Sequence, residues 1–451
     1  MMKEEILREL DRVLGYIENG EHLETEEMAT IRQDTIDNYQ GYFNTGYMDF
    51  RKSCTPDGTT IEWSDTVECI NDIDGTPYID CIGGFGTYIA GHRNPDIIKY
   101  VKKQLDRLTL SSTELLEPLR GYACKVLSMI TPGDLKYSFL TNGGAEAVEM
   151  ALKMAILAKG PGGYFISTVN GFHGKSIGAV SMTGNKTFRE PYLPLFQRVQ
   201  HVEFGVAEDL ERAIKNLFAV GEKVTAFIVE PVQGEAGIIV PPAGYLKAVR
   251  EICDKYGVAL IADEIQTGLG RTGSMWRCDA EGIVPDILIF GKATSGGIIP
   301  VTGIISREEI FLKSGLADNP FLLGSPTFGG NSLACSAFLA TVKYLVENDV
   351  PKMAAEKGAY FLEKLQALKK KHRILTEVRG IGMMLAMDFE TAEIGWEVSK
   401  EIFARHVLVA GTLNNAKVIR IEPPAVLTYE TIDKVLQVID EAVSAVELAN
   451  S

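Results

Sequence analysis

The chain has 451 residues, of which 46% are hydrophobic and 23% are charged, as in ordinary soluble globular proteins. Its formal net charge of −15 argues against nucleic acid and anionic membranes as partners, and no apolar stretch approaches the roughly 18 residues of a membrane span. The seven cysteines are odd in number and include no C-x-x-C pair, so we expect no disulfide framework, no zinc site and a cytoplasmic location.

Residues 1–80 are predicted to form an N-terminal segment of two helices, broken near Gly20, followed by a β-hairpin around Asp74-Gly75. The next segment, residues 83–92, holds too many glycines for a regular element. This composition predicts a loop in which the backbone passes close to other groups.

Short apolar strands alternate with helices through residues 81–330, which predicts a large α/β domain with a mostly parallel sheet. The predicted strands are 137–140, 163–167, 226–230, 258–263, 287–291 and 301–306, and the predicted helices include 144–159, 207–219 and 244–256. Residues 331–451 change to long helices (331–348 and 351–372) and strands near 374–379, 382–389 and 416–421. We interpret this last part as a small α+β domain that also takes up the N-terminal segment.

Two strand ends carry residues suited to cofactor chemistry. The apolar run 287–290 ends one glycine before Lys292, and a lysine at the carboxyl end of such a strand can form a Schiff base with a carbonyl cofactor. Asp263, at the end of the strand 258–263, can pair with a protonated ring nitrogen. Taken singly, each residue has a commoner alternative role: a solvated lysine and an aspartate that caps a helix.

Other residues suit the same chemistry. The glycine turn at Gly144 and Ala145 opens a helix whose free N–H groups can bind phosphate, and Phe172 lies where an aromatic ring can stack on a planar cofactor. Arg420 lies in an apolar strand, where an arginine usually binds a carboxylate, and Glu235 has glycines on both sides. Together these residues suit pyridoxal phosphate chemistry, although core packing and surface charge remain alternatives for each.

A nucleotide-binding protein is the rival interpretation. The residues 171–176 (GFHGKS) resemble a P-loop, and the pair Asp263-Glu264 resembles the acidic pair of an ATPase. A P-loop has a glycine where this chain has Val169, which weakens that interpretation.

Several ordered motifs resemble the class III aminotransferases, which are fold-type I enzymes that depend on pyridoxal phosphate. They are residues 230–235 (EPVQGE), 263–273 (DEIQTGLGRTG), the strand 285–292 that leads to the lysine, and 327–331 (TFGGN). The match spans about residues 60 to 445. It implies a large domain with a mostly parallel seven-stranded sheet and a small domain built from both termini.

The resemblance also implies a role for each matching residue. Lys292 would carry the cofactor and move the proton at the substrate carbon, Asp263 would hold the pyridinium proton, and Gln266 would bond the phenolic oxygen. The other implied cofactor residues are Phe172 and Ile265 on the two ring faces, His173, Gly144 and Ala145 at the phosphate, and Thr327 at the phosphate of the other subunit. The implied substrate residues are Phe85, lining a channel, and the pair Glu235 and Arg420, which opens for the carboxylate of a 2-oxo acid.

Three further stretches, residues 83–86 with 91–95, 135–139 and 407–424, resemble the putrescine-type members of the family. They imply ping-pong transfer of an amino group from a small diamine (putrescine or cadaverine) to 2-oxoglutarate, in polyamine catabolism, by a homodimer or larger assembly with active sites at the interface. The alternatives are ornithine, acetylornithine, 4-aminobutyrate and ω-amine:pyruvate aminotransferases.

One position departs from the family pattern. Where the family often has Ser-Gly-Thr, this chain has Gly143-Gly144-Ala145, so two side-chain hydroxyls are missing. A hydrogen bond to a charged group contributes about 1.5–3 kcal/mol. We therefore expect easier loss of the cofactor than from a typical relative.

Overall fold

The computed structural model describes residues 2–47, 60–112, 114–194 and 198–450. The chain divides into two compact units, one of residues 1–65 and 69–78 and the other of residues 66–68 and 79–451. All of the predicted site residues belong to the second unit.

The first unit begins with two helices, α1 (Met2–Asn19) and α2 (Thr25–Asn38), and a π-helical turn, η1 (Tyr39–Phe43). The strands β1 (Glu62–Asp65) and β2 (Cys69–Asp72) pair antiparallel, and a turn held by the bond from Gly75 N to Asp72 O leads into β3 (Pro77–Asp80). The guanidinium of Arg32 on α2 pairs with Asp72 at 2.7 Å, which joins the helix to this turn. The predicted break near Gly20 and the predicted hairpin are confirmed.

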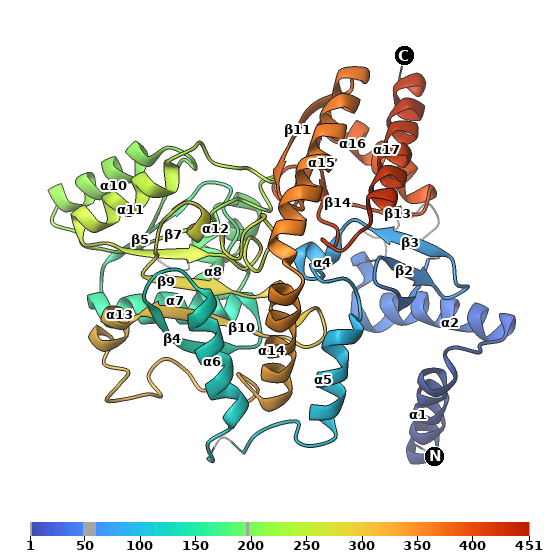
Figure 1. The fold of residues 1–451 in the computed structure, drawn as a ribbon, viewed down its shortest axis with the longest axis horizontal. Helices are drawn as coiled ribbons and strands as arrows, with labels where there is room; N and C mark the ends of the chain where they lie inside the picture. Colours follow the sequence, from blue (N-terminus) through green and yellow to red (C-terminus); the bar gives the residue numbers. More distant parts are fainter. Residues whose placement is uncertain (1, 48–59, 113, 195–197, 451) are drawn as a thin grey trace. The chain divides into compact units, whose positions relative to one another are not determined.

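A seven-stranded sheet organises the second unit (Figure 1), in the order β4-β10-β9-β8-β7-β5-β6. Its strands are β4 (Leu135–Thr141), β5 (Tyr164–Thr168), β6 (Val199–Val202), β7 (Val224–Val229), β8 (Ala259–Asp263), β9 (Ile287–Phe290) and β10 (Thr302–Arg307). β10 runs antiparallel to both of its neighbours, and the other pairs are parallel. The predicted mostly parallel sheet is confirmed; β6 was not predicted, because its centre is the polar pair Gln200-His201.

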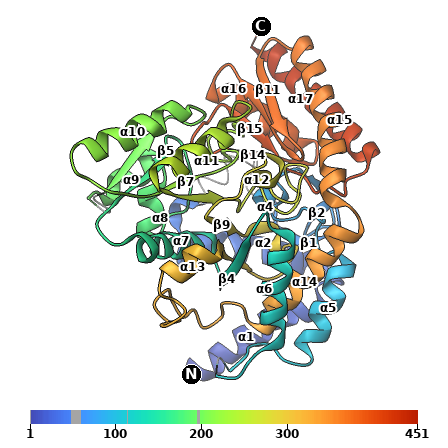
Figure 2. The same cartoon turned by 60° about the vertical axis from the view of Figure 1, so that its left-hand side comes forward.

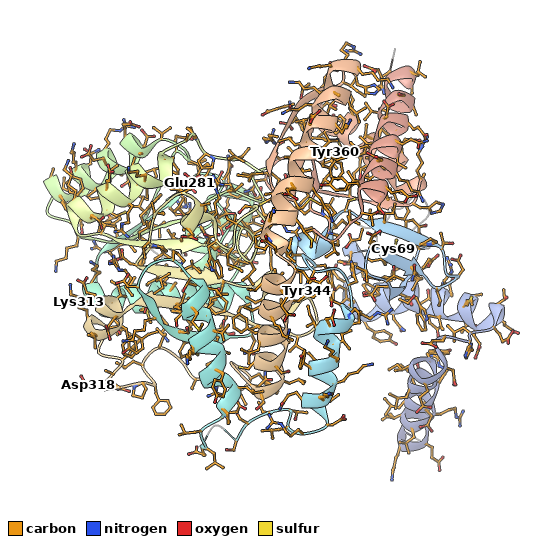
Figure 3. All side chains as sticks on the ribbon, in the orientation of Figure 1. Cys69, Glu281, Lys313, Asp318, Tyr344 and Tyr360 are labelled. Atoms are coloured by element: carbon orange, nitrogen blue, oxygen red, sulfur yellow. The ribbon has the colours of Figure 1, made fainter. Side chains whose placement is uncertain are left out.

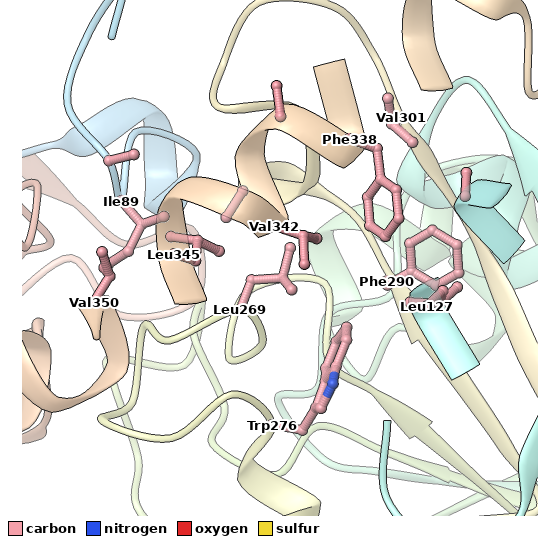
Figure 4. Packing of buried hydrophobic residues seen from close by; sticks show 14 of the residues in the cluster. Ile89, Leu127, Leu269, Trp276, Phe290, Val301, Phe338, Val342, Leu345 and Val350 are labelled. Carbon is pink, nitrogen blue, oxygen red and sulfur yellow. The ribbon is translucent and has the colours of Figure 1, made fainter. Parts of the chain in front are cut away.

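Both faces of this sheet are covered by helices, which explains why its strands are continuous apolar runs. Ile287 and Ile289 of β9 pack in a cluster with α7 (Gly144–Lys159), while Leu288 and Phe290 face the opposite cluster. Figure 4 shows Phe290 in that second cluster. The helices that line it are α6 (Pro118–Ile130) and α14 (Ser332–Glu347), and α10 (Ala207–Ala219) and α11 (Tyr245–Tyr256) cover β7 and β8.

The C-terminal part forms its own antiparallel sheet, β11-β12-β15-β14, beside the helices drawn in orange and red in Figure 2. Its elements are α15 (Val350–Lys371), β11 (Leu375–Ile381), β12 (Met384–Phe389), α16 (Ala392–Ala404), β14 (Ala410–Gly411), β15 (Val418–Ile421) and α17 (Tyr429–Ala449). Tyr360 on α15, labelled in Figure 3, donates its hydroxyl to Asp433 on α17 at 2.7 Å. The two long helices and three strands predicted here are confirmed. No helix among the described residues is both long enough and apolar enough to cross a bilayer.

The glycine-rich segment predicted as a loop begins with a short helical turn, α4 (Gly83–Gly86), whose backbone is left-handed. Gly83 has a φ of 59°, and a Cβ built on it would lie 2.0 Å from the backbone oxygen of Glu422. The predicted close approach of the backbone is thus confirmed, and only glycine suits both the conformation and the space.

We expect the substitution Gly83→Ala to lower the free energy of unfolding by about 2–5 kcal/mol, because left-handed strain costs about 1–2 and overpacking about 1–3 kcal/mol. Gly257→Ala is the matched control, since Gly257 is also left-handed (φ 67°) but has no other atom within 4 Å of a built Cβ. Urea unfolding of both variants measures the difference. Equal losses would contradict the proposed contact with Glu422.

Candidate active site

Lys292 follows β9 at the carboxyl edge of the sheet, two residues after the fully buried Phe290. It opens the 3-10 turn η3 (Lys292–Ser295) with a φ of 47°, which is uncommon for a residue other than glycine. Such strain costs about 1–3 kcal/mol and gathers at functional sites. The side chain is half-buried, and its ammonium forms no hydrogen bond or ion pair within the described part of the chain. The backbone of Lys292 therefore has a fixed conformation, while its amine has no partner among the described residues.

The surroundings of Lys292 adjust its protonation. Burial lowers the pKa of Lys292, while the carboxylates of Glu422 and Glu235 act against this shift. A lowered pKa increases the fraction of neutral amine, which is the nucleophilic and basic form.

Asp263 ends β8, the strand next to β9, and is buried. Its Oδ2 lies 2.8 Å from Nδ1 of His173, and its Oδ1 accepts the backbone N–H of Ile265 at 3.2 Å. Since a carboxylate only accepts hydrogen bonds, the Nδ1 of His173 carries the proton. The residues after Asp263 form turns, so the alternative role as a helix cap does not apply. His173 thus fixes the orientation of the Asp263 carboxylate.

Glu230, which follows β7, is a site residue that the sequence analysis did not single out. Its buried carboxylate accepts the backbone N–H groups of Phe172 (2.8 Å) and Gly234 (3.1 Å). Burial raises the pKa of Glu230 to about 7, and the charge of Asp263 adds to the shift. The sequence could have indicated Glu230, because this residue lies at the end of a strand and opens the EPVQGE motif. Its hydrogen bond with the backbone of Phe172 joins the segment 172–173 to the end of β7.

Gln266 leads to a second residue that was missed, Glu422. The Nε2 of Gln266 donates to both carboxylate oxygens of Glu422, at 2.8 and 3.0 Å, and also lies 3.4 Å from the backbone oxygen of Phe85. Glu422 is completely buried and follows β15 directly. The sequence could have indicated Glu422, because it is a charged residue at the end of an apolar strand.

Glu235 and Arg420 form a bidentate ion pair, with N–O distances of 2.8 and 2.7 Å. The guanidinium also lies over the ring of Phe85, 4.8 Å from its centroid. Burial opposes ionisation of Glu235, but the charge and hydrogen bonds of Arg420 hold the pKa of Glu235 below its ordinary value. The predicted carboxylate partner of Arg420 is therefore Glu235, and Phe85 lies against the same pair.

The start of α7 lies close to the end of β9. A Cβ built on Gly144 would lie 3.1 Å from the Ile265 side chain, and one built on Gly291 would lie 3.4 Å from it. Ile265 therefore lies between the turn that opens α7 and the turn that carries Lys292. Because the first N–H groups of a helix have no intrahelical partner, an anion can bind at Gly144 and Ala145.

Two predicted residues are less closely tied to this arrangement. Phe172 is half-buried, and its ring meets Phe188 edge-on at 6.2 Å. Thr327 is exposed, and within the described residues no contact joins it to Lys292. The role of Thr327 at the phosphate of another subunit stays a prediction.

The rival nucleotide-binding interpretation finds little support in the geometry. The Lys175 ammonium lies over the ring of Phe188, 4.3 Å from its centroid, and the Ser176 hydroxyl donates to Glu149. The carboxylate of Glu264 is taken up by Thr267 and by two backbone N–H groups. These groups do not converge as a P-loop and its acidic pair would.

Comparison with known proteins identifies the family. Residues 61–443 match the family model of the class-III aminotransferases. The chain belongs to the class III aminotransferases. It is a pyridoxal-phosphate-dependent transaminase of fold-type I, in agreement with the resemblance that the motifs indicated.

Solved structures agree with this assignment. An ornithine aminotransferase from Toxoplasma gondii ME49 is 29% identical, with a TM-score of 0.85 over 96% of this chain and 98% of that one. An amine transaminase from an uncultivated Pseudomonas species, in its pyridoxal-phosphate-bound form, is 28% identical (TM-score 0.80; 86% and 96% covered). An acetylornithine aminotransferase from Elizabethkingia anophelis is 27% identical (TM-score 0.73; 86% and 94% covered).

The residues of this aminotransferase fit pyridoxal phosphate. The amine of Lys292 has no partner among the described residues, and the buried Asp263 carboxylate is oriented by His173. Ile265 lies between the N-terminus of α7 and the turn that carries Lys292, and its backbone N–H donates to Asp263. Amine, carboxylate and anion-binding turn are the three groups that this cofactor requires.

We expect Arg420→Met to lower the free energy of unfolding by about 3–5 kcal/mol, because it leaves the buried Glu235 carboxylate unpaired. Glu235→Gln should lower the free energy of unfolding by less, because the Arg420 guanidinium still has the Glu422 carboxylate as a partner at 3.7 Å. Guanidinium chloride unfolding measures both. The control is Glu308→Gln, which removes an exposed partner of Lys136 and should change little. A larger loss for Glu235→Gln than for Arg420→Met would contradict this account.

Proposed function

We propose that this aminotransferase transfers an amino group from a small diamine, putrescine or cadaverine, to 2-oxoglutarate. The observation that carries the proposal is the negative charge around Lys292, where Glu422 and Glu235 both act on the amine. The guanidinium of Arg420 acts on the amine in the opposite direction, but it is already bound to Glu235. Such surroundings favour a cationic donor without a carboxylate of its own. The putrescine-like stretches of the sequence support the same choice.

Pyridoxal phosphate, when bound, supplies an electron sink that stabilises negative charge on the substrate carbon. Lys292 is proposed to bind it covalently and to move the proton at that carbon, as its lowered pKa favours. Asp263, oriented by His173, would hold the proton of the ring nitrogen. Phe172 and Ile265 are proposed to contact the ring, Gln266 its phenolic oxygen, and Gly144, Ala145 and the Thr327 of a second copy its phosphate, in a homodimer with shared sites.

The Glu235–Arg420 pair would serve the two substrates differently. A diamine donor has no carboxylate, so the pair stays closed and presents Phe85 and aliphatic surface to the donor chain. A 2-oxo acid brings a carboxylate that competes with Glu235 for the planar guanidinium, which binds carboxylates in bidentate fashion. This exchange allows one site to accept both a cation and a dianion.

Ornithine is the second candidate donor, because two of the similar structures are named as ornithine and acetylornithine aminotransferases. It carries the diamine chain of putrescine together with a carboxylate. The two donors therefore differ by the one group that the acidic surroundings of Lys292 should disfavour.

A donor panel tests the proposal. With 2-oxoglutarate as acceptor, we expect kcat/KM for putrescine or cadaverine to exceed that for ornithine or 4-aminobutyrate by about tenfold or more, since one unfavourable charge contact costs several kcal/mol. Glutamate formation is measured. Lys292→Ala is the negative control and should lose both turnover and the visible absorbance that borohydride removes from the wild type. No turnover of either diamine would overturn the proposal, and a colourless protein that hydrolyses ATP would favour the nucleotide-binding rival.

The phosphate turn gives a second test. Ala145→Thr adds a hydroxyl beside the start of α7, and we expect it to tighten cofactor binding by about tenfold or more, because a hydrogen bond to a charged group contributes about 1.5–3 kcal/mol. Gly174, whose built Cβ would lie 2.7 Å from the Ala145 Cβ, leaves room only because it has no side chain. Ala145→Val is the control of similar shape without a hydroxyl. Dialysis followed by absorbance measures retention, and equal retention in wild type and Ala145→Thr would contradict the expectation.

A further inference from the structure

The segment 411–414, called the clamp segment below, runs from the end of β14 into the turn before β15. The side chain of Asn414 bonds it to two distant parts of the chain: Nδ2 donates to the backbone oxygen of Asn170 at 2.7 Å, and Oδ1 accepts from Nδ2 of Asn185 at 2.6 Å. Asn185 also caps the start of the short helix α9 (Lys186–Arg189). The side chain of Asn414 therefore fixes the clamp segment against the segments that follow β5.

The backbone of the clamp segment holds both partners of the Glu235–Arg420 pair. The backbone oxygen of Gly411 accepts from Arg420 Nε at 2.9 Å, and the N–H of Leu413 donates to Glu235 Oε2 at 3.0 Å. That carboxylate oxygen is the one that Nη2 of Arg420 binds at 2.7 Å. The N–H of Asn414 donates to the backbone oxygen of Glu235 at 3.1 Å. Together these four bonds stabilise the closed arrangement of the pair.

The clamp segment keeps its position through hydrogen bonds more than through apolar packing. Gly411 and Leu413 are exposed, as are Ala416 and Lys417 in the rest of the turn. A segment with little buried apolar surface opens locally at a low free energy. The two side-chain bonds of Asn414 therefore have a large effect on how often the clamp segment leaves the pair.

The closed pair has opposite consequences for the two substrates. A donor without a carboxylate is proposed to react while the pair is closed, whereas the 2-oxo acid is proposed to bind Arg420 after Glu235 has moved away. The bond from the Leu413 N–H to the Glu235 carboxylate is charge-assisted and favours the closed pair. A ligand that binds only a minor state has its apparent affinity reduced by the population of that state, so this bond weakens acceptor binding.

We propose that Asn414 is a positioning residue that holds the Glu235–Arg420 pair closed through the clamp segment and thereby limits the affinity of the site for substrates with a carboxylate. The inference rests on the proposed function in one respect, namely that Arg420 binds the carboxylate of the 2-oxo acid. It does not depend on the identity of the amine donor. Loosening the contacts of Asn414 should therefore strengthen the binding of the acceptor.

The test measures the binding of glutarate, an unreactive dicarboxylate with the chain length of 2-oxoglutarate, to the holoenzyme by titration calorimetry. We expect Asn414→Ala to bind glutarate about threefold or more tightly than the wild type, because the closed state loses two neutral hydrogen bonds. In the acceptor half-reaction, KM for 2-oxoglutarate should fall by the same factor. KM for butanal, an acceptor without a carboxylate, should stay the same, and backbone amide exchange at Leu413 should become faster.

Two further variants complete the test. Asn185→Asp keeps the oxygen that accepts from Thr187 N at the start of α9 but replaces the donor to Asn414 with an acceptor. We expect the same direction of change from it, even where Asn414→Ala folds poorly. The control is Asn348→Ala, which removes an exposed amide that donates to the backbone oxygen of Tyr344 at 2.9 Å and should leave glutarate affinity unchanged.

Glutarate affinity that is unchanged or weaker in either folded variant would overturn the role of Asn414. Equal changes of KM for 2-oxoglutarate and butanal would do the same, because a merely structural defect affects both acceptors alike. If Arg420→Lys binds glutarate as tightly as the wild type, the proposed carboxylate site is wrong and the inference fails with it, since lysine cannot bind a carboxylate in bidentate fashion. If the donor panel favours ornithine, the diamine function is wrong while the role of Asn414 stands.

Discussion

The burial of β9 on both faces determines where the chemistry of this aminotransferase takes place. Ile287 and Ile289 pack toward α7, and Leu288 and Phe290 pack toward α6 and α14, so the strand cannot shift or rotate without exposing apolar surface. Lys292 follows two residues later in a left-handed conformation that only a rigid surrounding maintains. The neighbouring strands β8 and β7 end at the same edge and deliver Asp263 and Glu230 there.

Charge compensation then decides what each acidic group does. Asp263 is oriented by its hydrogen bond with His173. Glu235 is oriented by Arg420, whose charge and hydrogen bonds lower the pKa of Glu235. Glu422 has a neutral amide as its direct partner and shares Arg420 at longer distance. Burial lowers the pKa of Lys292, and the carboxylates of Glu422 and Glu235 oppose that shift.

Much of the fold was predictable from local pattern. The helices 144–159 and 207–219 appear with the predicted bounds, because long periodic segments with clear ends carry the strongest signal in a sequence. β6 was missed because its two central residues, Gln200 and His201, break the apolar pattern. The local sequence pattern could not predict the antiparallel direction of β10 either, because strand pairing joins residues that are far apart in the chain.

For the site, the motifs around Asp263 and Lys292 were enough to predict the family, the cofactor and the candidate lysine, because they lie in short ordered stretches. Which side chains meet depends on the folded chain. Glu235 and Arg420 are 185 positions apart, and Gln266 and Glu422 are 156 apart, so no local spacing relates them. Their contacts arise because β15 brings its end to the turns after β7 and β8. A carboxylate in the sequence looks the same whether it is solvated or buried, and only the fold shows that Glu422 is buried and bonded to Gln266.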